Sequence, residues 1–267
     1  MPFPYKCVVL VGATSGIGGS MAEKLVCEGT KVIVAGRRKG RLDTFVQKHG
    51  KDKSGAIVFD IADTRGHSKF VDTVMATYPE VDCIFLNAGI QQQHDLTKPA
   101  QLDFAAFHHE VTVNFTSFVN LTYAFLPFLL TKKESTGIIY TGSHLSIIPA
   151  FNLPAYSASK AALNAFVQCL RYQLFLAKAN VNVIELSPPA VQTELHDETM
   201  GERGRSFGMP LDVFTKEAYK GLASGHDQVF IGTVGPQKEG QKDTFMELVD
   251  NRRKLFEWLS GVMAAHY

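Results

Sequence analysis

The sequence predicts an α/β fold: a doubly wound parallel sheet of about seven strands in a single domain. Seven short runs rich in β-branched residues alternate with polar, periodic or alanine-rich segments along the chain. The runs are apolar throughout, as strands are when helices cover both faces of their sheet. They read KCVVLVG, KVIVAG, GAIVFD, VDCIFLNAG, GIIYTGS, VNVIELS and QVFIG. This alternation is typical of repeated βαβ units.

Composition restricts the classes of function. The chain has 267 residues, of which 45% are hydrophobic, and this suits one large domain over residues 1–267. A net charge of +1 gives no field that would attract nucleic acid or an anionic membrane. The most apolar run, FVNLTYAFLPFLL, is shorter than the roughly 20 residues of a membrane span, and the N-terminus has no signal-peptide pattern. We therefore expect a cytoplasmic protein with no membrane span and no nucleic-acid partner.

The cysteines and histidines predict no metal site. The cysteines form no CxxC pair, and we expect them to be reduced core residues; they are Cys7, Cys27, Cys83 and Cys169. His94, His108 and His109 are expected to be exposed or capping residues rather than ligands.

A glycine-rich turn, GATSGIG, follows the first predicted strand and opens the first helix. Gly12, Gly16 and Gly18 permit a tight turn and let backbone N–H groups approach a phosphate at the positive end of the helix. A turn of purely structural use is the alternative. The strand–turn–helix context favours nucleotide binding.

The residues after the second strand predict the choice of cofactor. An acidic residue there normally binds the ribose 2′-hydroxyl of NAD, but this chain has Gly36 followed by Arg37 and Arg38. A guanidinium binds a 2′-phosphate through charge-assisted hydrogen bonds. The sequence thus predicts NADP(H) over NADH, with a solvated basic turn as the alternative.

The ends of the third and fourth strands supply further candidates. Asp60 ends the third strand, where it is expected to contact adenine or to cap a helix. The small residues of LNAG (86–89) would let a cofactor pass close to the backbone, although a strand-end turn would also explain them.

Tyr156 and Lys160 lie four residues apart at the start of an alanine-rich helical run, so they share a helix face. A phenol titrates near 10, and a nearby ammonium would favour the phenolate that acid–base chemistry needs. Ser143 ends the strand GIIYTGS at the same edge of the sheet, where its hydroxyl is expected to bind a substrate oxygen or to cap a helix.

Taken in order, GATSGIG, LNAG, Asn114 in VTVNFTS, Ser143, YSASK and SPPAVQT resemble the short-chain dehydrogenase/reductase family, in its single-domain form, over nearly the whole chain. The resemblance implies a Rossmann-type ketoreductase that uses NADP(H). Tyr156 would exchange a proton with the substrate oxygen while hydride moves between nicotinamide and carbon, in either direction.

The resemblance also implies supporting roles. Ser143 would position the substrate oxygen, Lys160 would lower the tyrosine pKa and bind the nicotinamide ribose, and Asn114 would hold a water of the proton relay. The complete set of candidate cofactor-binding residues is Gly12, Thr14, Ser15, Gly16, Ile17, Gly18, Arg37, Arg38, Asp60, Ile61, Asn87, Ala88, Gly89, Tyr156, Lys160, Pro188, Val191 and Thr193.

Three positions depart from the family pattern. Val11 replaces a threonine, Leu86 replaces the first asparagine of Asn-Asn-Ala-Gly, and Pro189 replaces the glycine of Pro-Gly. The first two remove hydrogen-bonding groups from the central strands, and the last fixes a φ angle near the expected substrate mouth.

Substrate and assembly are expected from the remaining segments. The mostly apolar loop HLSIIPAFNLPAY suits an apolar or aromatic carbonyl compound, or plain core packing. Residues 194–210 form a candidate substrate lid or an ordinary surface loop, and residues 243–264 an amphipathic C-terminal helix. The family often forms homodimers or homotetramers, for which Phe118, Phe125, Phe166 and Phe175 are candidate interface or core residues.

Two other functions stay open. One is a dinucleotide-binding regulator or interaction module without turnover, and the other is a dehydratase or epimerase on the same fold. The set of Asn114, Ser143, Tyr156 and Lys160 favours catalysis, since a binding module needs the glycine turn but not these four side chains.

Overall fold

The computed structural model describes residues 2–235 and 243–266, and the chain divides into two compact units, Met1–Ile231 and Gly232–Tyr267. The second unit contains the helix α9 (Thr244–Ala264). Asp243 caps this helix, because its Oδ1 accepts hydrogen bonds from the backbone N–H groups of Phe245 and Met246 at 3.0 and 3.2 Å.

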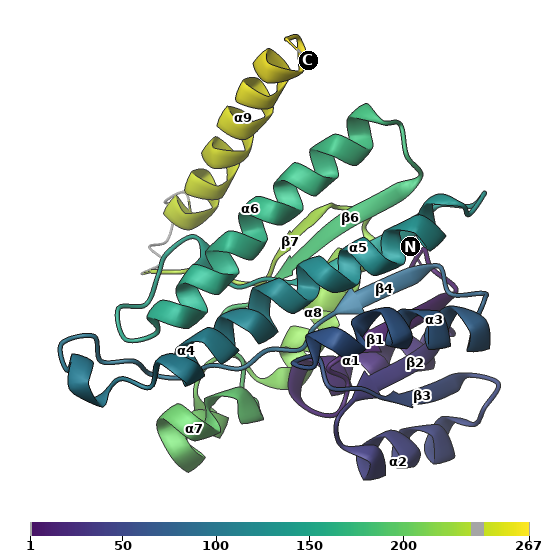
Figure 1. Cartoon of the computed structure of the whole chain (residues 1–267), viewed down its shortest axis with the longest axis horizontal. Coiled ribbons are helices and arrows are strands. Elements are labelled where there is room, and N and C mark those ends of the chain that lie inside the picture. Colours follow the sequence, from purple (N-terminus) through teal and green to yellow (C-terminus); the bar gives the residue numbers. More distant parts are fainter. Residues whose placement is uncertain (1, 236–242, 267) are drawn as a thin grey trace. The chain divides into compact units, whose positions relative to one another are not determined.

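The first unit is built on one seven-stranded sheet in which every neighbouring pair is parallel (Figure 1). The strand order is β3-β2-β1-β4-β5-β6-β7. The predicted fold class is therefore confirmed. The strands are β1 (Cys7–Val11), β2 (Lys31–Gly36), β3 (Ser54–Val58), β4 (Cys83–Leu86), β5 (Thr136–Thr141), β6 (Val181–Ser187) and β7 (Gln228–Phe230).

Helices cover both faces of the sheet. Val9 and Ile33 pack with α3, α5 and α6, whereas their chain neighbours Val8 and Val32 pack with α1, α2 and α8. Successive side chains of a strand point to opposite faces, which explains why the strands are apolar at every position. The helices are α1 (Gly16–Cys27), α2 (Lys39–His49), α3 (His67–Thr77), α4 (Phe104–Val111), α5 (Ser117–Leu130), α6 (Pro154–Leu176), α7 (Asp197–Met200) and α8 (Leu211–Ala223).

Strands β2 and β3 follow β1 toward one side of the sheet, whereas β4 to β7 follow one another toward the other side, so the switch point lies between β1 and β4. Connections from the ends of these strands lead away to opposite sides, which opens a crevice at the carboxyl edge of the sheet. Both the glycine turn after β1 and the LNAG segment after β4 lie at this edge. The fold thus brings candidate residues that are some 70 positions apart in sequence to one place.

One helical run differs from its sequence-based description. Helices α4 and α5 are joined by a π-helical turn, Thr112–Thr116, so the run extends over Phe104–Leu130. By length and composition alone this run could cross a membrane, because it is longer than the apolar segment FVNLTYAFLPFLL within it. Its side chains Phe118, Leu121 and Phe125 are fully buried against the sheet, as in the core helix of a globular domain.

Burial corrects one expectation and decides part of another. Cys7 and Cys83 are buried, but Cys27 and Cys169 are exposed and so are not core residues. Among the four aromatic residues considered for an interface, Phe118 and Phe125 belong to the core. Phe175 is 70% exposed.

Candidate active site

The glycine turn is packed too closely for side chains. Gly12 has a φ of +86°, and a Cβ added there would lie 2.6 Å from the backbone of Ala88. A Cβ on Gly18 would lie 2.1 Å from the carbonyl oxygen of Gly12. Helix α1 begins at Gly16, so its first N–H groups lie at this turn. The turn therefore presents bare backbone donors at a positive helix end, which fits a dinucleotide pyrophosphate.

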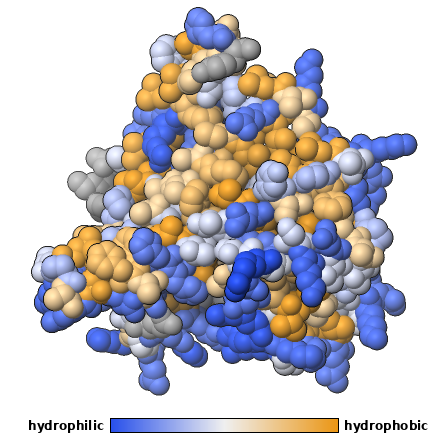
Figure 2. Space-filling model, viewed as in Figure 1, coloured by the Kyte–Doolittle hydropathy of each residue, from blue (hydrophilic) through white to orange (hydrophobic). Residues whose placement is uncertain are grey.

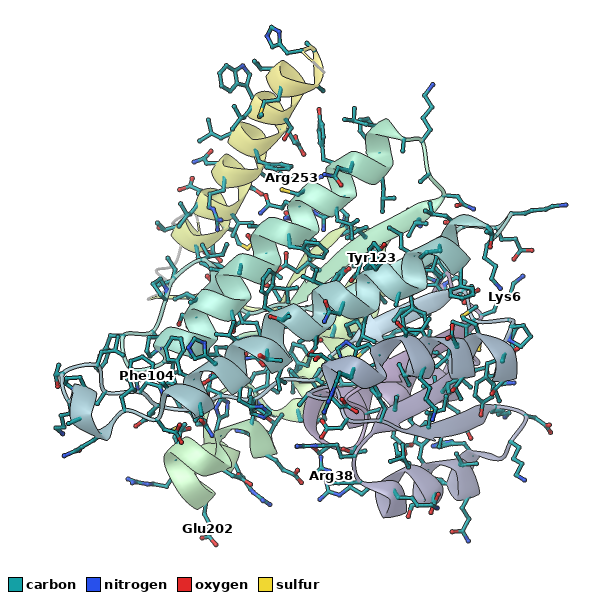
Figure 3. All side chains as sticks on the ribbon, in the orientation of Figure 1. Lys6, Arg38, Phe104, Tyr123, Glu202 and Arg253 are labelled. Carbon is teal, nitrogen blue, oxygen red and sulfur yellow. The ribbon has the colours of Figure 1, made fainter. Side chains whose placement is uncertain are left out.

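Arg38 lies against this turn (Figure 3). Its Nε donates to Thr14 Oγ1 at 2.9 Å and its Nη2 donates to Ser15 Oγ. Arg41, which the sequence did not single out, donates from Nη1 to the carbonyl oxygen of Thr14 at 3.0 Å. The Arg37 side chain is exposed. The donor set at the turn suits a second phosphate group in addition to the pyrophosphate.

Glu194 pairs with both of these arginines, and the sequence did not single it out either. Arg38 Nη1 donates to its Oε2 at 2.8 Å, and Arg41 Nη1 donates to its Oε1 at 3.0 Å. The hydrogen bond from Arg38 is the main reason that the pKa of Glu194 falls to about 2. Nothing in a linear pattern links Glu194 to Arg38, because 156 residues separate them.

The ends of β3 and β4 fix the other side of the crevice. Asp60 Oδ1 accepts from the N–H of Ala62 at 3.0 Å, which is a local turn-capping contact, and Ile61 is buried. Asn87 Nδ2 donates to the carbonyl oxygen of Gly12 at 3.2 Å, and its Oδ1 accepts from Thr141 Oγ1 at 2.9 Å. Asn87 thereby ties together the ends of β1, β4 and β5.

The segment after β6 carries the remaining cofactor candidates. Pro188 accepts a hydrogen bond at its carbonyl oxygen from the N–H of His144 at 3.1 Å, and Val191 is buried. Thr193 lies next to the glycine turn, since a Cβ on Gly16 would lie 3.2 Å from the Thr193 Cβ. Ile17 is half-buried and packs into the core from α1.

The candidate catalytic residues meet at the same edge. Tyr156 lies in the first turn of α6 and Lys160 one turn later, and both are buried, as are Ser143 and Asn114. Lys160 Nζ donates to the carbonyl oxygen of Thr141 at 2.8 Å and lies 5.6 Å from the centre of the Tyr156 ring. A Cβ on Gly89 would lie 3.9 Å from Lys160 Nζ, so LNAG borders this cluster.

Burial shifts both key pKa values. Burial is the main reason that the pKa of Tyr156 rises to about 12. The hydrogen bond with Ser143 lowers this pKa, and the charge of Glu110 raises it. Burial lowers the pKa of Lys160 to about 8, although the charge of Glu185 raises it. At neutral pH Tyr156 is therefore a protonated acid beside a largely cationic lysine, and the lowering of its pKa that we expected from Lys160 is outweighed by burial in this structure.

Asn114 lies in the π-helical turn between α4 and α5. Its Oδ1 accepts from Ile90 N at 3.0 Å, and its Nδ2 donates to Ile90 O at 2.9 Å and to Ser159 Oγ at 3.3 Å. Ser159 Oγ donates in turn to the carbonyl oxygen of Tyr156 at 2.8 Å. Such single π turns occur often at functional sites. Here the turn links the segment after β4 to the tyrosine helix.

A buried histidine–carboxylate pair adjoins this cluster. Glu110 is fully buried one helical turn before Asn114, and its Oε2 lies 3.1 Å from His94 Nε2. Our expectation for His94 is therefore wrong, because the histidine is buried against Glu110 and the ring of Phe107 rather than exposed. His108 and His109 are exposed, as expected. The four-residue spacing of Glu110 and Asn114, which places both on one helix face, was the sequence signal that could have linked Glu110 to this site.

The fold and the site together define a nucleotide-binding oxidoreductase architecture: a glycine turn at a sheet switch point, with a buried Ser-Tyr-Lys-Asn cluster beside it. Known proteins agree with this description. The family model for the short chain dehydrogenases matches residues 6–203. The chain therefore belongs to the short-chain dehydrogenase/reductase family, which confirms the resemblance seen in the sequence, and it is an oxidoreductase of that family.

Individual relatives cover nearly the whole chain. A Bacillus subtilis (strain 168) protein named "Uncharacterized oxidoreductase DltE" is 30% identical over 265 residues, covering 97% of this chain and 98% of that protein. A short-chain dehydrogenase/reductase from Burkholderia phymatum in complex with NAD superposes with a TM-score of 0.78 at 20% identity, covering 86% and 90% of the two chains. An alcohol dehydrogenase from the archaeon Thermococcus sibiricus, complexed with 5-hydroxy-NADP, gives 0.75 at 21% identity over 88% and 99%.

Proposed function

We propose that this chain is an NADP(H)-dependent reductase of ketones or aldehydes, or the corresponding alcohol dehydrogenase, with Tyr156 as general acid and base. The observation that carries the proposal is the burial of Tyr156, Ser143 and Lys160 in one cluster beside a glycine turn lined by arginine. A module that only bound a dinucleotide would have no need of a buried phenol and ammonium, whose burial costs free energy.

The proposed roles follow from the contacts. When bound, a reduced nicotinamide supplies the hydride. Tyr156 Oη donates the proton that the carbonyl oxygen gains, and the Ser143 hydroxyl, whose Oγ is held by the N–H of Leu145 at 3.1 Å, positions that oxygen. Lys160 keeps a positive charge near the phenol, and Asn114 orders the proton path behind it. The buried setting strengthens each of these interactions.

The preference for NADP(H) rests on the basic cluster. Arg38 and Arg41 lie at the turn, Arg37 adds a third guanidinium nearby in the chain, and Gly36 ends β2 without a carboxylate. A carboxylate at that strand end would favour the 2′-hydroxyl of NAD and repel a 2′-phosphate. Asp60, Ile61 and the LNAG segment are proposed to border the adenosine and ribose, and Val191 and Thr193 the nicotinamide.

The substrate is proposed to be an apolar or aromatic carbonyl compound. The loop between β5 and α6 carries exposed apolar side chains, among them Ile148 and Phe151, which is 96% exposed. Residues 194–210 are proposed as a lid, and in the structure they contain three short helical turns, Glu194–His196, Asp197–Met200 and Gly201–Ser206. Large exposed apolar groups beside a polar site favour ligand binding.

We further propose a cytoplasmic homo-oligomer. Apolar side chains gather on the surface over α5 and α6 (Figure 2), where Tyr123 is 82% and Phe175 70% exposed. A face of this kind suits a second copy of the chain. Light scattering on the purified protein distinguishes a dimer or tetramer from a monomer.

The experiment that tests the function is a rate measurement on the purified chain. Aldehydes and ketones of increasing apolar size are supplied with NADPH and with NADH, and oxidation of each cofactor is followed. The proposal expects turnover with NADPH that exceeds turnover with NADH. Binding of NADPH without turnover of any carbonyl would favour a regulatory module instead, and activity without net cofactor turnover would favour a dehydratase or epimerase.

A further inference from the structure

The carboxylate of Glu194 occupies the space between the two arginines of the glycine turn. Arg38 Nη1 donates to its Oε2 at 2.8 Å, and Arg41 Nη1 donates to both of its oxygens, to Oε1 at 3.0 Å and to Oε2 at 3.3 Å. The three side chains are only 36–49% exposed, so the pairs are partly screened from water. Glu194 is ionised at neutral pH, and the hydrogen bond from Arg38 stabilises this charge further, lowering the pKa of Glu194 to about 2.

The same arginines hold the turn. Arg38 also donates to the side chains of Thr14 and Ser15, and Arg41 to the carbonyl oxygen of Thr14. The residue before Glu194, Thr193, packs on the turn itself at Gly16. The segment that begins at Glu194 is thus fastened to the phosphate-binding turn through one carboxylate and two guanidinium groups.

The 2′-phosphate of a bound dinucleotide would need hydrogen bonds from the same two guanidinium groups. The 2′-phosphate that separates NADPH from NADH is an anion, and Arg38 and Arg41 place two guanidinium groups at the turn where the proposed function puts this phosphate. The Nη1 groups of both arginines already donate to Glu194. Two anions on the same guanidinium groups would repel each other, so binding of the phosphate and binding of the carboxylate oppose one another.

We propose that Glu194 is an internal anion that competes with the cofactor 2′-phosphate for Arg38 and Arg41. It is a specificity-determining residue that weakens the binding of NADPH but not the binding of NADH. When the 2′-phosphate displaces its carboxylate, the segment Glu194–Ser206 is released from the turn. This inference rests on the proposed NADP(H) function, and it adds a direct coupling between the cofactor phosphate and the candidate lid.

Calorimetric titration of the full chain tests the competition. Wild type, Glu194→Gln and the control Glu80→Gln are titrated with NADPH and with NADH; Glu80 pairs with a lysine across the surface at 2.7 Å and is 45% exposed, but it lies away from the turn. The amide is isosteric and uncharged. Glu194→Gln is expected to bind NADPH about fivefold more tightly, as loss of a partly exposed competing charge implies. NADH affinity is expected to stay within about twofold, and the control to match wild type for both.

A second readout needs no catalysis. Hydrogen exchange of residues 194–206 is expected to be faster in ligand-free Glu194→Gln than in wild type, and 2′,5′-ADP is expected to accelerate it in wild type where 5′-AMP does not. Unchanged or weaker NADPH binding by Glu194→Gln, or an equal gain for NADH, would overturn the competition while leaving the proposed cofactor intact. Failure of every form to bind either dinucleotide would overturn the proposed function, and this inference with it.

Discussion

Lys160 donates a hydrogen bond of 2.8 Å from its ammonium nitrogen to the carbonyl oxygen of Thr141, at the end of β5. A helix that begins at Pro154 is thereby fixed to the strand that leads to Ser143. The contact holds the cation at the edge of the sheet, 5.6 Å from the centre of the Tyr156 ring. The position of this lysine is therefore set by the backbone of the sheet.

Burial of Lys160 predicts a particular pH dependence of stability. Its pKa is about 8 in the folded chain against 10.5 ordinarily, so between these pH values the unfolded chain binds more protons. This group alone should raise the free energy of unfolding across the window, by up to roughly 3 kcal/mol, while the raised pKa values of buried Cys7 and Cys83 act in the opposite sense above pH 9, so the effect of Lys160 is the difference in slope from Lys160→Met. Urea unfolding at a series of pH values from 7.5 to 10 measures this change in the free energy of unfolding. Lys160→Met should lack this rise, and an equal slope in both proteins would contradict the prediction.

Replacing glycine by alanine is expected to have opposite effects on stability at two sites, one in the glycine turn and one in α2. Gly12→Ala places a methyl group 2.6 Å from the backbone of Ala88 at a positive φ, and should destabilise the chain by several kcal/mol. A Cβ added at Gly40, the second residue of α2, would have nothing within 4 Å, so Gly40→Ala should stabilise the chain by about 0.5 kcal/mol. Thermal unfolding compares the two. A mild effect at Gly12 would show that the turn is looser than described.

Arg38 predicts a difference between the two cofactors. Arg38→Gln removes a charge-assisted donor at the turn, so the Kd of NADPH should rise at least about tenfold while that of NADH changes by less than about twofold. Lys39→Gln is the control, because Lys39 is paired with Asp43 one turn along α2. Equal losses for NADPH and NADH would mean that Arg38 supports the turn without contacting a 2′-phosphate.

The buried Glu110 predicts a shift in the kinetic pKa of Tyr156. Its negative charge raises the tyrosine pKa, so Glu110→Gln should lower it, and reduction should lose rate at a lower pH than in wild type. The exposed Glu134, which pairs with Lys6, offers a neutral control in Glu134→Gln. A pH–rate profile with an unchanged or higher alkaline limb in Glu110→Gln would contradict this effect of the Glu110 charge.

Much of this site could be predicted because parallel strands end at one edge. Ser143, Asn87 and the glycine turn were placed together from strand ends alone, and Tyr156 with Lys160 from helical spacing. The charge pair of Arg38 with Glu194 could not be predicted, since it joins two polar surface segments that carry no hydrophobic period. His94 was misplaced for a related reason: its neighbours are polar, and its burial depends on a carboxylate 16 residues away.

The rate of NADPH oxidation by Tyr156→Phe tests the central claim most directly, measured beside wild type and Tyr123→Phe with a carbonyl compound that wild type reduces. Tyr123 lies on α5 and is 82% exposed, so its hydroxyl serves as the control. With Tyr156 as proton donor, Tyr156→Phe should lose at least about 100-fold in kcat while its NADPH affinity stays within about threefold of wild type. A rate within tenfold of wild type would contradict that role.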